Sequence, residues 1–204
     1  MADACCGGDV AATDKRHRKV LLVVLGINVL AFLLMTTGSW LSGSSSLLSG
    51  MLDNFGDAVT YALSFAVVGA ASQTKARVAL FKGFLILGAA VAVAVHIAWR
   101  LSNLHAPVVD VMLVTAVLNL AANGVCFWML TPLRHDDVNM ASVWECSRND
   151  LFEGGAVIVT SGLVWITQSG WPDVLVAALL LFIFLRSAIR VLRSAWQEMG
   201  TPAY

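Results

Sequence analysis

Charged residues are scarce in this sequence. Only 13% of the 204 residues are Asp, Glu, Lys or Arg, whereas 58% are hydrophobic. A soluble domain of this size does not need so much apolar surface, so the composition predicts a membrane protein. The 13 basic and 13 acidic residues cancel to a formal net charge of zero. This balance argues against a strongly basic, nucleic-acid-binding protein.

Cysteine is also rare, and a secretion signal is missing. The four cysteines lack the regular spacing of a disulfide framework, and two of them fall in or near apolar segments. The N-terminus stays polar as far as Lys19, so the first apolar run begins too late and is too long for a cleaved signal peptide. We therefore expect neither a disulfide framework nor signal-peptide cleavage.

Six apolar segments follow the polar tail, each near the length of about 20 residues that a transmembrane helix requires. They predict an all-α, polytopic membrane protein with six transmembrane helices. A disordered, basic cytoplasmic tail is expected over residues 1–19, a six-helix membrane domain over residues 20–196, and a short tail over residues 197–204. We place the segments at about residues 20–40, 46–70, 79–100, 108–131, 141–167 and 172–194.

The basic residues sort to one side of the expected membrane domain. Twelve of the 13 Lys and Arg fall in the N-terminal tail, the second and fourth connections, the start of the fifth helix or the C-terminal end. Only Arg100 falls on the opposite side. The positive-inside rule then predicts that both termini are cytoplasmic, and an even number of spans agrees with that. The expected location is the inner (plasma) membrane of the cell.

Two acidic residues interrupt the second apolar segment. Asp53 and Asp57 are four residues apart, so on a helix they lie one turn apart on nearly the same face. An ionisable side chain at the centre of a bilayer costs about 2.5–3.5 kcal/mol on insertion-type scales. A divalent cation bound by both carboxylates would offset that cost. The simpler alternative is a pair at the mouth of the helix, solvated by interfacial water.

A second polar pair lies in the fifth segment. Cys146 and Asp150 are again four residues apart, and Asn149 and Glu153 lie on the same stripe. We expect Asn149 and Glu153 to orient the ligands, although Glu153 is alternatively a direct ligand or an interfacial charge. If the two helices pack face to face, four ligands are available for a tetrahedral metal site: Asp53, Asp57, Cys146 and Asp150.

This ligand set predicts a competition between metal and protons. Three carboxylates and a thiol in a low-dielectric cavity cannot all be ionised without a cation, so the empty site should hold at least one proton. Zn²⁺ requires deprotonated ligands, and its binding therefore expels protons. Thiolate favours Zn²⁺ and the softer Cd²⁺, whereas all-oxygen sites suit Mg²⁺ or Mn²⁺. We expect Zn²⁺ first and Cd²⁺ second, each as substrate, with no resident cofactor.

Three stretches of the sequence resemble the cation diffusion facilitators. SSSLLSGMLDNFGDAV is similar to the second transmembrane helix of that family, with its acidic or His residue four positions before an Asp. LNLAANGVCFWML and RHDDVNMASVWECSRNDLFEGGAV resemble the fourth helix, the following loop and the fifth helix, and WPDVLVAALLLFIFLRSAIRVLRSA resembles the sixth. The resemblance covers most of the chain from about residue 20 onward.

The resemblance implies a homodimeric exporter that exchanges cytoplasmic divalent metal ions for protons by alternating access. The family's transport site falls here on Asp53, Asp57, Cys146 and Asp150. Two departures stand out. Cys146 occupies a position that is commonly His in the family, and the chain ends at GTPAY soon after the sixth helix. We therefore expect a short form without the family's C-terminal cytoplasmic regulatory domain.

Three other residues are weaker candidates for capturing metal ions. Cys5 and Cys6 form a pair in the N-terminal tail that could bind a soft ion, although an incidental pair in a mobile tail explains them equally well. His135 is followed by two Asp residues after the fourth segment. That trio is more typical of a solvated turn than of a metal site.

The main alternative is an integral-membrane, metal-dependent enzyme such as a lipid-modifying transferase. Phospholipid-forming transferases also carry metal-binding Asp residues four positions apart on a membrane helix. However, they carry an Asp-Gly and Ala-Arg run upstream, which is absent before Asp53, and they need no second pair on a distant helix. We therefore expect a secondary transporter rather than an enzyme.

Overall fold

The computed structural model describes residues 4–66, 72–135 and 138–200, with side chains given for most residues from Arg16 onward. Within these ranges the chain is all-α, as predicted, and contains no strand. A single 3₁₀ turn, η1, covers Thr131–Leu133. The six α-helices are α1 (Ala4–Ser42), α2 (Ser45–Ala66), α3 (Ser72–Ser102), α4 (Val109–Leu130), α5 (Val138–Thr167) and α6 (Trp171–Gly200).

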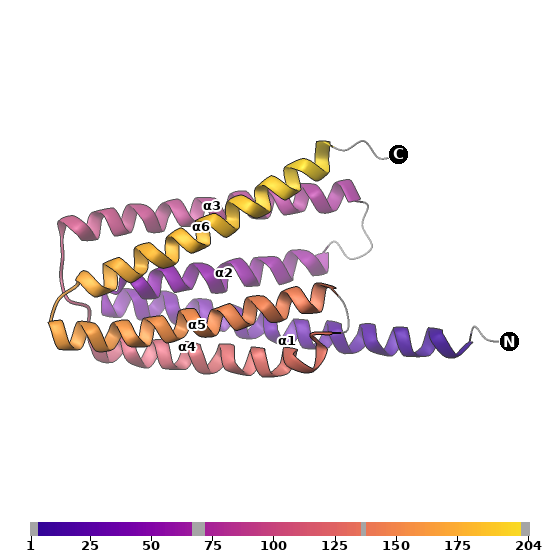
Figure 1. Ribbon diagram of the computed structural model, residues 1–204, viewed down its shortest axis with the longest axis horizontal. Coiled ribbons are helices and arrows are strands. Elements are labelled where there is room, and N and C mark those ends of the chain that lie inside the picture. Colours follow the sequence, from indigo (N-terminus) through magenta and orange to yellow (C-terminus); the bar gives the residue numbers. More distant parts are fainter. Residues whose placement is uncertain (1–3, 67–71, 136–137, 201–204) are drawn as a thin grey trace.

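The helices form one elongated bundle with both chain ends at the same end (Figure 1). The most extensive packing is between α3 and α6, between α1 and α2, and between α4 and α5. Helix α1 also packs against α4, and α2 packs against α6. Helices α1, α2, α4 and α5 therefore enclose a common interior. The end of the bundle opposite the termini is called the distal end below.

Three helices are long and apolar enough to cross a membrane, judged over the described residues: Arg16–Ser42, Val109–Leu133 and Ser147–Thr167. A shorter apolar helix covers Leu87–Ser102. Helix α2 is less apolar because Ser, Gly, Asn and Asp residues occupy much of its interior-facing side. The count of six spans and the side on which the termini lie stay predictions.

Many large apolar side chains lie on the outside of the bundle. Large side chains that are half exposed or more occur on α1, α3, α4, α5 and α6, among them Leu30, Phe84, Trp128, Phe152 and Phe182. Polar residues such as Asn28, Asn54 and Asn119 are buried instead. This arrangement is the one expected where lipid rather than water surrounds the helices, because lipid solvates apolar surface.

The N-terminal segment differs from its prediction. Helix α1 begins at Ala4, so the backbone predicted to be disordered over residues 1–19 is helical from that residue onward. No proline occurs before Pro107. The helix of the first span can therefore continue toward the N-terminus without a residue that breaks its hydrogen bonding.

A tight turn at Gly43 joins α1 to α2 and sets where the polar face of α2 points. Gly43 has φ +69°, a left-handed conformation that glycine adopts without steric cost. Its N–H donates to Ser39 O over 2.8 Å. The Ser44 N–H donates to Ser42 Oγ, and the Ser39 hydroxyl donates to Ser44 O, so serine side chains satisfy the turn. Helix α2 consequently returns directly along α1.

Candidate metal site

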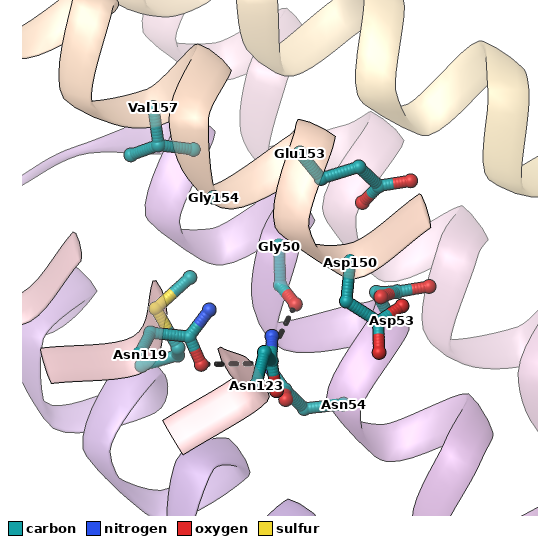
Figure 2. A pocket seen from close by; sticks show the side chains of 10 residues that line it. Gly50, Asp53, Asn54, Asn119, Asn123, Asp150, Glu153, Gly154 and Val157 are labelled. Atoms are coloured by element: carbon teal, nitrogen blue, oxygen red, sulfur yellow. Dashed lines mark hydrogen bonds between the residues drawn. The ribbon is translucent and has the colours of Figure 1, made fainter. Parts of the chain in front are cut away.

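Helices α2 and α5 bring one carboxylate each to the same point. Asp53 lies on α2 and Asp150 on α5, and their side chains point toward each other (Figure 2). Their carboxyl groups are close enough for each to affect the ionisation of the other. Asp150 is only 5% exposed, and the pair therefore lies inside the bundle.

The two carboxylates line a small polar cavity with Glu153, one turn further along α5. The cavity is small: the space that the centre of a water molecule can occupy is about 10 Å³. This is close to the minimum that one water molecule needs. Met35 and Val157 close part of it with apolar atoms. Glu153 thus lines the same cavity as the carboxylate pair, and its role there stays a prediction.

Three asparagines form the side of the cavity away from the carboxylates (Figure 2). The Asn54 side-chain amide on α2 donates to Asn119 Oδ1 on α4 over 3.1 Å and to Gly50 O over 3.2 Å. Asn54 and Asn123 are each 2% exposed, and the Oδ1 atoms of both are buried without a hydrogen-bond partner. These amides link α4 to the site by polar contacts.

Asn54 was not among the site residues predicted from the sequence. One signal was available, because Asn54 directly follows Asp53 within an apolar segment. Adjacent positions on a helix are about 100° apart. Asn54 can therefore line the same cavity from a second angle while it contacts α4.

Asp57 lies one turn from Asp53 toward the end with the termini, and it is not among the residues that line the cavity. Its Oδ2 accepts a hydrogen bond from the Tyr61 hydroxyl over 3.3 Å. Asp57 is partly buried. The shared face of Asp53 and Asp57 therefore extends from the cavity toward the termini.

Cys146 lies on α5 one turn before Asp150, but its side chain is outside those that the structure describes. Among the described side chains, no three His, Cys, Asp or Glu residues lie close enough together to hold a metal ion. The complete four-ligand site therefore stays a prediction. Of the four predicted ligands, Asp53 and Asp150 line the same cavity. Glu153, which is not one of the four, lines that cavity too.

The remaining candidates lie away from this cavity. The Asn149 side chain is exposed, although Asn149 belongs to the helix that carries Asp150. His135 is exposed and accepts a hydrogen bond at Nε2 from Arg134 Nε over 2.9 Å. Cys5 and Cys6 fall within α1, and their side chains are not described. Their assigned roles stay predictions.

Comparison with known proteins identifies the domain. The model of the cation efflux transmembrane domain matches residues 21–199, which is most of the chain. The chain belongs to the cation efflux family. The resemblance to the cation diffusion facilitators is thereby confirmed, and so is the expectation of an all-α membrane protein.

Two curated members of the cation efflux family are similar to this chain. Both are named zinc transporter ZitB, one from Yersinia pestis and one from Yersinia pseudotuberculosis serotype I (strain IP32953). Each is 26% identical over 91% of this chain. The alignment covers 64% of each relative, so the chain spans just under two thirds of their length.

Proposed function

We propose that this protein exports divalent transition-metal ions from the cytoplasm, with Zn²⁺ as the first substrate and Cd²⁺ as the second. The observation that carries the proposal is the buried Asp53–Asp150 pair, which two helices of a cation efflux domain bring together. The names of the two relatives support zinc as the cargo. A thiol at Cys146 would favour soft ions further.

The same pair supports exchange against protons. Two carboxylates that face each other away from water repel when both are ionised, so the empty site favours a bound proton, and a divalent cation that binds both carboxylates must displace it. When the site opens toward a more acidic exterior, protons compete with the metal for the same oxygens. Alternating exposure of the site to the two sides then gives antiport by ligand competition.

We place the protein in the inner (plasma) membrane and propose that it works as a homodimer. Its exposed apolar side chains suit a lipid environment. Small residues on α3, such as Gly88 and Ala92, are exposed in the single chain and would allow a second helix to approach closely. A metal-dependent lipid-modifying enzyme, the alternative from the sequence, gains no support from the comparisons.

Reconstitution into liposomes tests the proposal. A metal added outside liposomes that contain a pH-sensitive dye should drive proton movement in the opposite direction, with Zn²⁺ more effective than Mg²⁺. Liposomes without protein and liposomes with the Asp150→Asn variant are the controls. Metal movement without proton movement would refute antiport, and metal-dependent turnover of a lipid nucleotide in place of metal movement would favour the enzyme.

A further inference from the structure

Asp173 is a second buried carboxylate, and it lies far from the metal site. It occupies the first turn of α6 at the distal end and is 0% exposed. It was not among the site residues predicted from the sequence. Its carboxylate accepts four hydrogen bonds.

All four of these hydrogen bonds come from the start of α2. Oδ1 accepts the Ser44 hydroxyl over 2.6 Å, the Ser46 hydroxyl over 2.7 Å and the Ser46 N–H over 3.0 Å. Oδ2 accepts the Ser45 N–H over 2.6 Å. The three serines are each 0% exposed. A residue of α6 therefore caps the N-terminus of α2, across 127 to 129 positions of sequence.

This contact is strong for identifiable reasons. The first N–H groups of an α-helix have no partner inside the helix, and the positive end of the helix dipole favours an anion there. Hydrogen bonds to a charged acceptor are roughly twice as strong as neutral ones. One turn further along, the Ser49 hydroxyl donates to Ala177 O on α6 over 3.0 Å, which extends the connection.

The connection closes the distal end of the bundle between α2 and α6. In Figure 1, α6 starts beside α2 at the distal end and diverges from it toward the termini. Between Asp173 and the polar cavity lies a buried apolar cluster that includes Leu47, Met112 and Leu180, together with Met35 and Val157 of the cavity lining. An ion could leave the cavity at this end only if α2 moved away from that cluster.

We propose that Asp173 is the clamp of a distal gate. It is a positioning residue that holds the start of α2 against α6 and must release α2 before the cavity can open at the distal end. The release breaks four hydrogen bonds together, so the gate has two discrete arrangements rather than a continuous range. The link to metal release rests on the proposed transport function, whereas the clamp itself does not.

The test measures access to the clamp with a thiol probe at position 45. The Ser45 hydroxyl is buried and has no hydrogen-bond partner, and only its backbone N–H contacts Asp173. Ser45→Cys therefore leaves the clamp intact. A charged, membrane-impermeant maleimide is applied from the distal side of intact cells or vesicles, and mass spectrometry follows the labelling of position 45.

Asp173→Asn should raise the labelling rate at position 45 by about tenfold or more, because the loss of even one hydrogen bond to a charged group suffices for that factor. Asp110→Asn is the matched control, since Asp110 also lies in the first turn of its helix at the distal end but is exposed. It should leave the rate unchanged. An unchanged rate in Asp173→Asn, or an equal rise in Asp110→Asn, would overturn the proposal.

A second probe separates gate opening from general loosening of the bundle. Cys126 on α4 is a native free thiol that is buried far from the clamp. Its labelling by a membrane-permeant maleimide should not change in Asp173→Asn. A parallel rise at Cys126 and at position 45 would assign Asp173 a purely structural role and overturn the gate.

Where Asp173→Asn fails to fold, Ser46→Ala takes its place, because it removes one hydroxyl donor and keeps the backbone N–H. Its expected rise at position 45 is about threefold to tenfold. Ser161→Ala is the control, since that buried hydroxyl bonds only to Val157 O of its own helix. No rise in a folded Ser46→Ala protein would overturn the clamp.

Metal uptake into inside-out vesicles then tests the link to transport. If Asp173→Asn shifts the population toward the distal-open state, half-maximal uptake should require a several-fold higher metal concentration. Absence of metal uptake in the unmodified protein would refute the proposed function and leave the labelling result standing. Increased labelling with an unchanged metal requirement would refute the gate alone.

Discussion

At the scale of single residues, the arrangement of the carboxylates governs what this protein can bind. Asp53 and Asp150 face each other inside the bundle, and Glu153 lines the same cavity. Three acidic groups in so small a volume repel one another when ionised, and they also lack water to solvate them. A cation or bound protons must relieve that repulsion. In the proposed transport function, metal ions and protons therefore compete for one set of oxygens.

The first prediction concerns this carboxylate pair. Asp53→Asn and Asp150→Asn should each lower metal transport by more than about a hundredfold, because even a residue that only orients a ligand contributes about 10- to 100-fold to metal affinity. The melting temperature should hold or rise, since the amide removes a buried charge and its repulsion of the other carboxylate. Uptake into inside-out vesicles and a melting curve for each variant measure both quantities.

The exposed Asp110 provides the control for that prediction, and Asp110→Asn should transport like the unmodified protein. A folded Asp150→Asn variant that retained its transport rate would remove this pair from the site.

The second prediction tests Cys146 as a ligand. Cys146→Ser replaces a thiol that can bind as a soft thiolate with a hydroxyl that stays protonated, so Zn²⁺ and Cd²⁺ transport should both fall, with Cd²⁺ falling more. Cys146→His supplies a nitrogen ligand and should restore Zn²⁺ transport while Cd²⁺ transport stays low. The measurement is the ratio of the two uptake rates.

The buried Cys126 supplies the control for the second prediction, since Cys126→Ser should leave that ratio unchanged. Undiminished Cd²⁺ uptake in Cys146→Ser would exclude Cys146, and Glu153 would become the candidate for the fourth ligand.

At the scale of helices, close contacts between backbones determine how the site is assembled. Gly38 on α1 faces Thr115 on α4 so closely that a Cβ atom there would overlap the threonine side chain. Gly50 on α2 faces the end of Met35, and Gly154 on α5 faces Leu120 on α4. Such glycines let helices approach in a membrane bundle, where packing rather than the hydrophobic effect drives association.

The third prediction follows from the contact at Gly38. Gly38→Ala would place its Cβ 2.8 Å from Thr115 Cβ and closer still to the two outer atoms of that side chain. Overpacking of this kind costs about 1–3 kcal/mol. The melting temperature should fall, and Thr115→Ala in the same protein should restore part of the loss.

Gly26 on the same helix is the matched control, because a Cβ there meets no atom within 4 Å. Gly26→Ala should be neutral or stabilising by up to about 1 kcal/mol, as the difference in helix propensity predicts. Thermal unfolding in detergent measures all three variants. Equal melting temperatures for Gly38→Ala and Gly26→Ala would show that α1 and α4 separate without cost.

At the scale of the whole molecule, the exterior is suited to a bilayer and the ends of the bundle differ. Apolar side chains cover the outside, the clamp at Asp173 closes the distal end, and α6 diverges from α2 toward the termini. At that opposite end, the guanidinium carbons of Arg134 and Arg148 lie over the Trp144 ring, 5.3 Å and 5.4 Å from its centroid. Cations next to an indole are typical of a membrane interface.

The fourth prediction concerns oligomeric state. We expect a homodimer in mild detergent, held by contacts between membrane helices, because the exposed surface of α3 includes small residues. Gly88→Leu should weaken the dimer, since no atom of the single chain lies within 4 Å of a Cβ at that position. Light scattering or native mass spectrometry measures the mass, and Gly155→Leu on α5 is a comparison at another open glycine. A monomer under all conditions that preserve transport would contradict the expectation.

The sequence by itself determined the helices and the angular positions of the polar residues. The length of each apolar segment predicted a helix, and the predicted bounds agree with α2, α4 and α5 to within four residues, whereas α3 begins seven residues earlier and α6 ends six residues later than predicted. The four-residue spacing put Asp53 with Asp57, and Cys146 with Asp150, on common faces, because 3.6 residues complete a turn. For α1 the sequence predicted the span but not its continuation back to Ala4.

Only the tertiary structure decided which of those faces meet. Helical periodicity gives the direction of a side chain around its own axis, whereas the neighbour it contacts depends on how the whole bundle packs. The structure therefore decided that Asp53 pairs with Asp150, and that Asn54 reaches Asn119. It also decided that Asp173 caps a helix that begins 128 positions earlier, because hydrogen bonds over such separations depend on the packed fold.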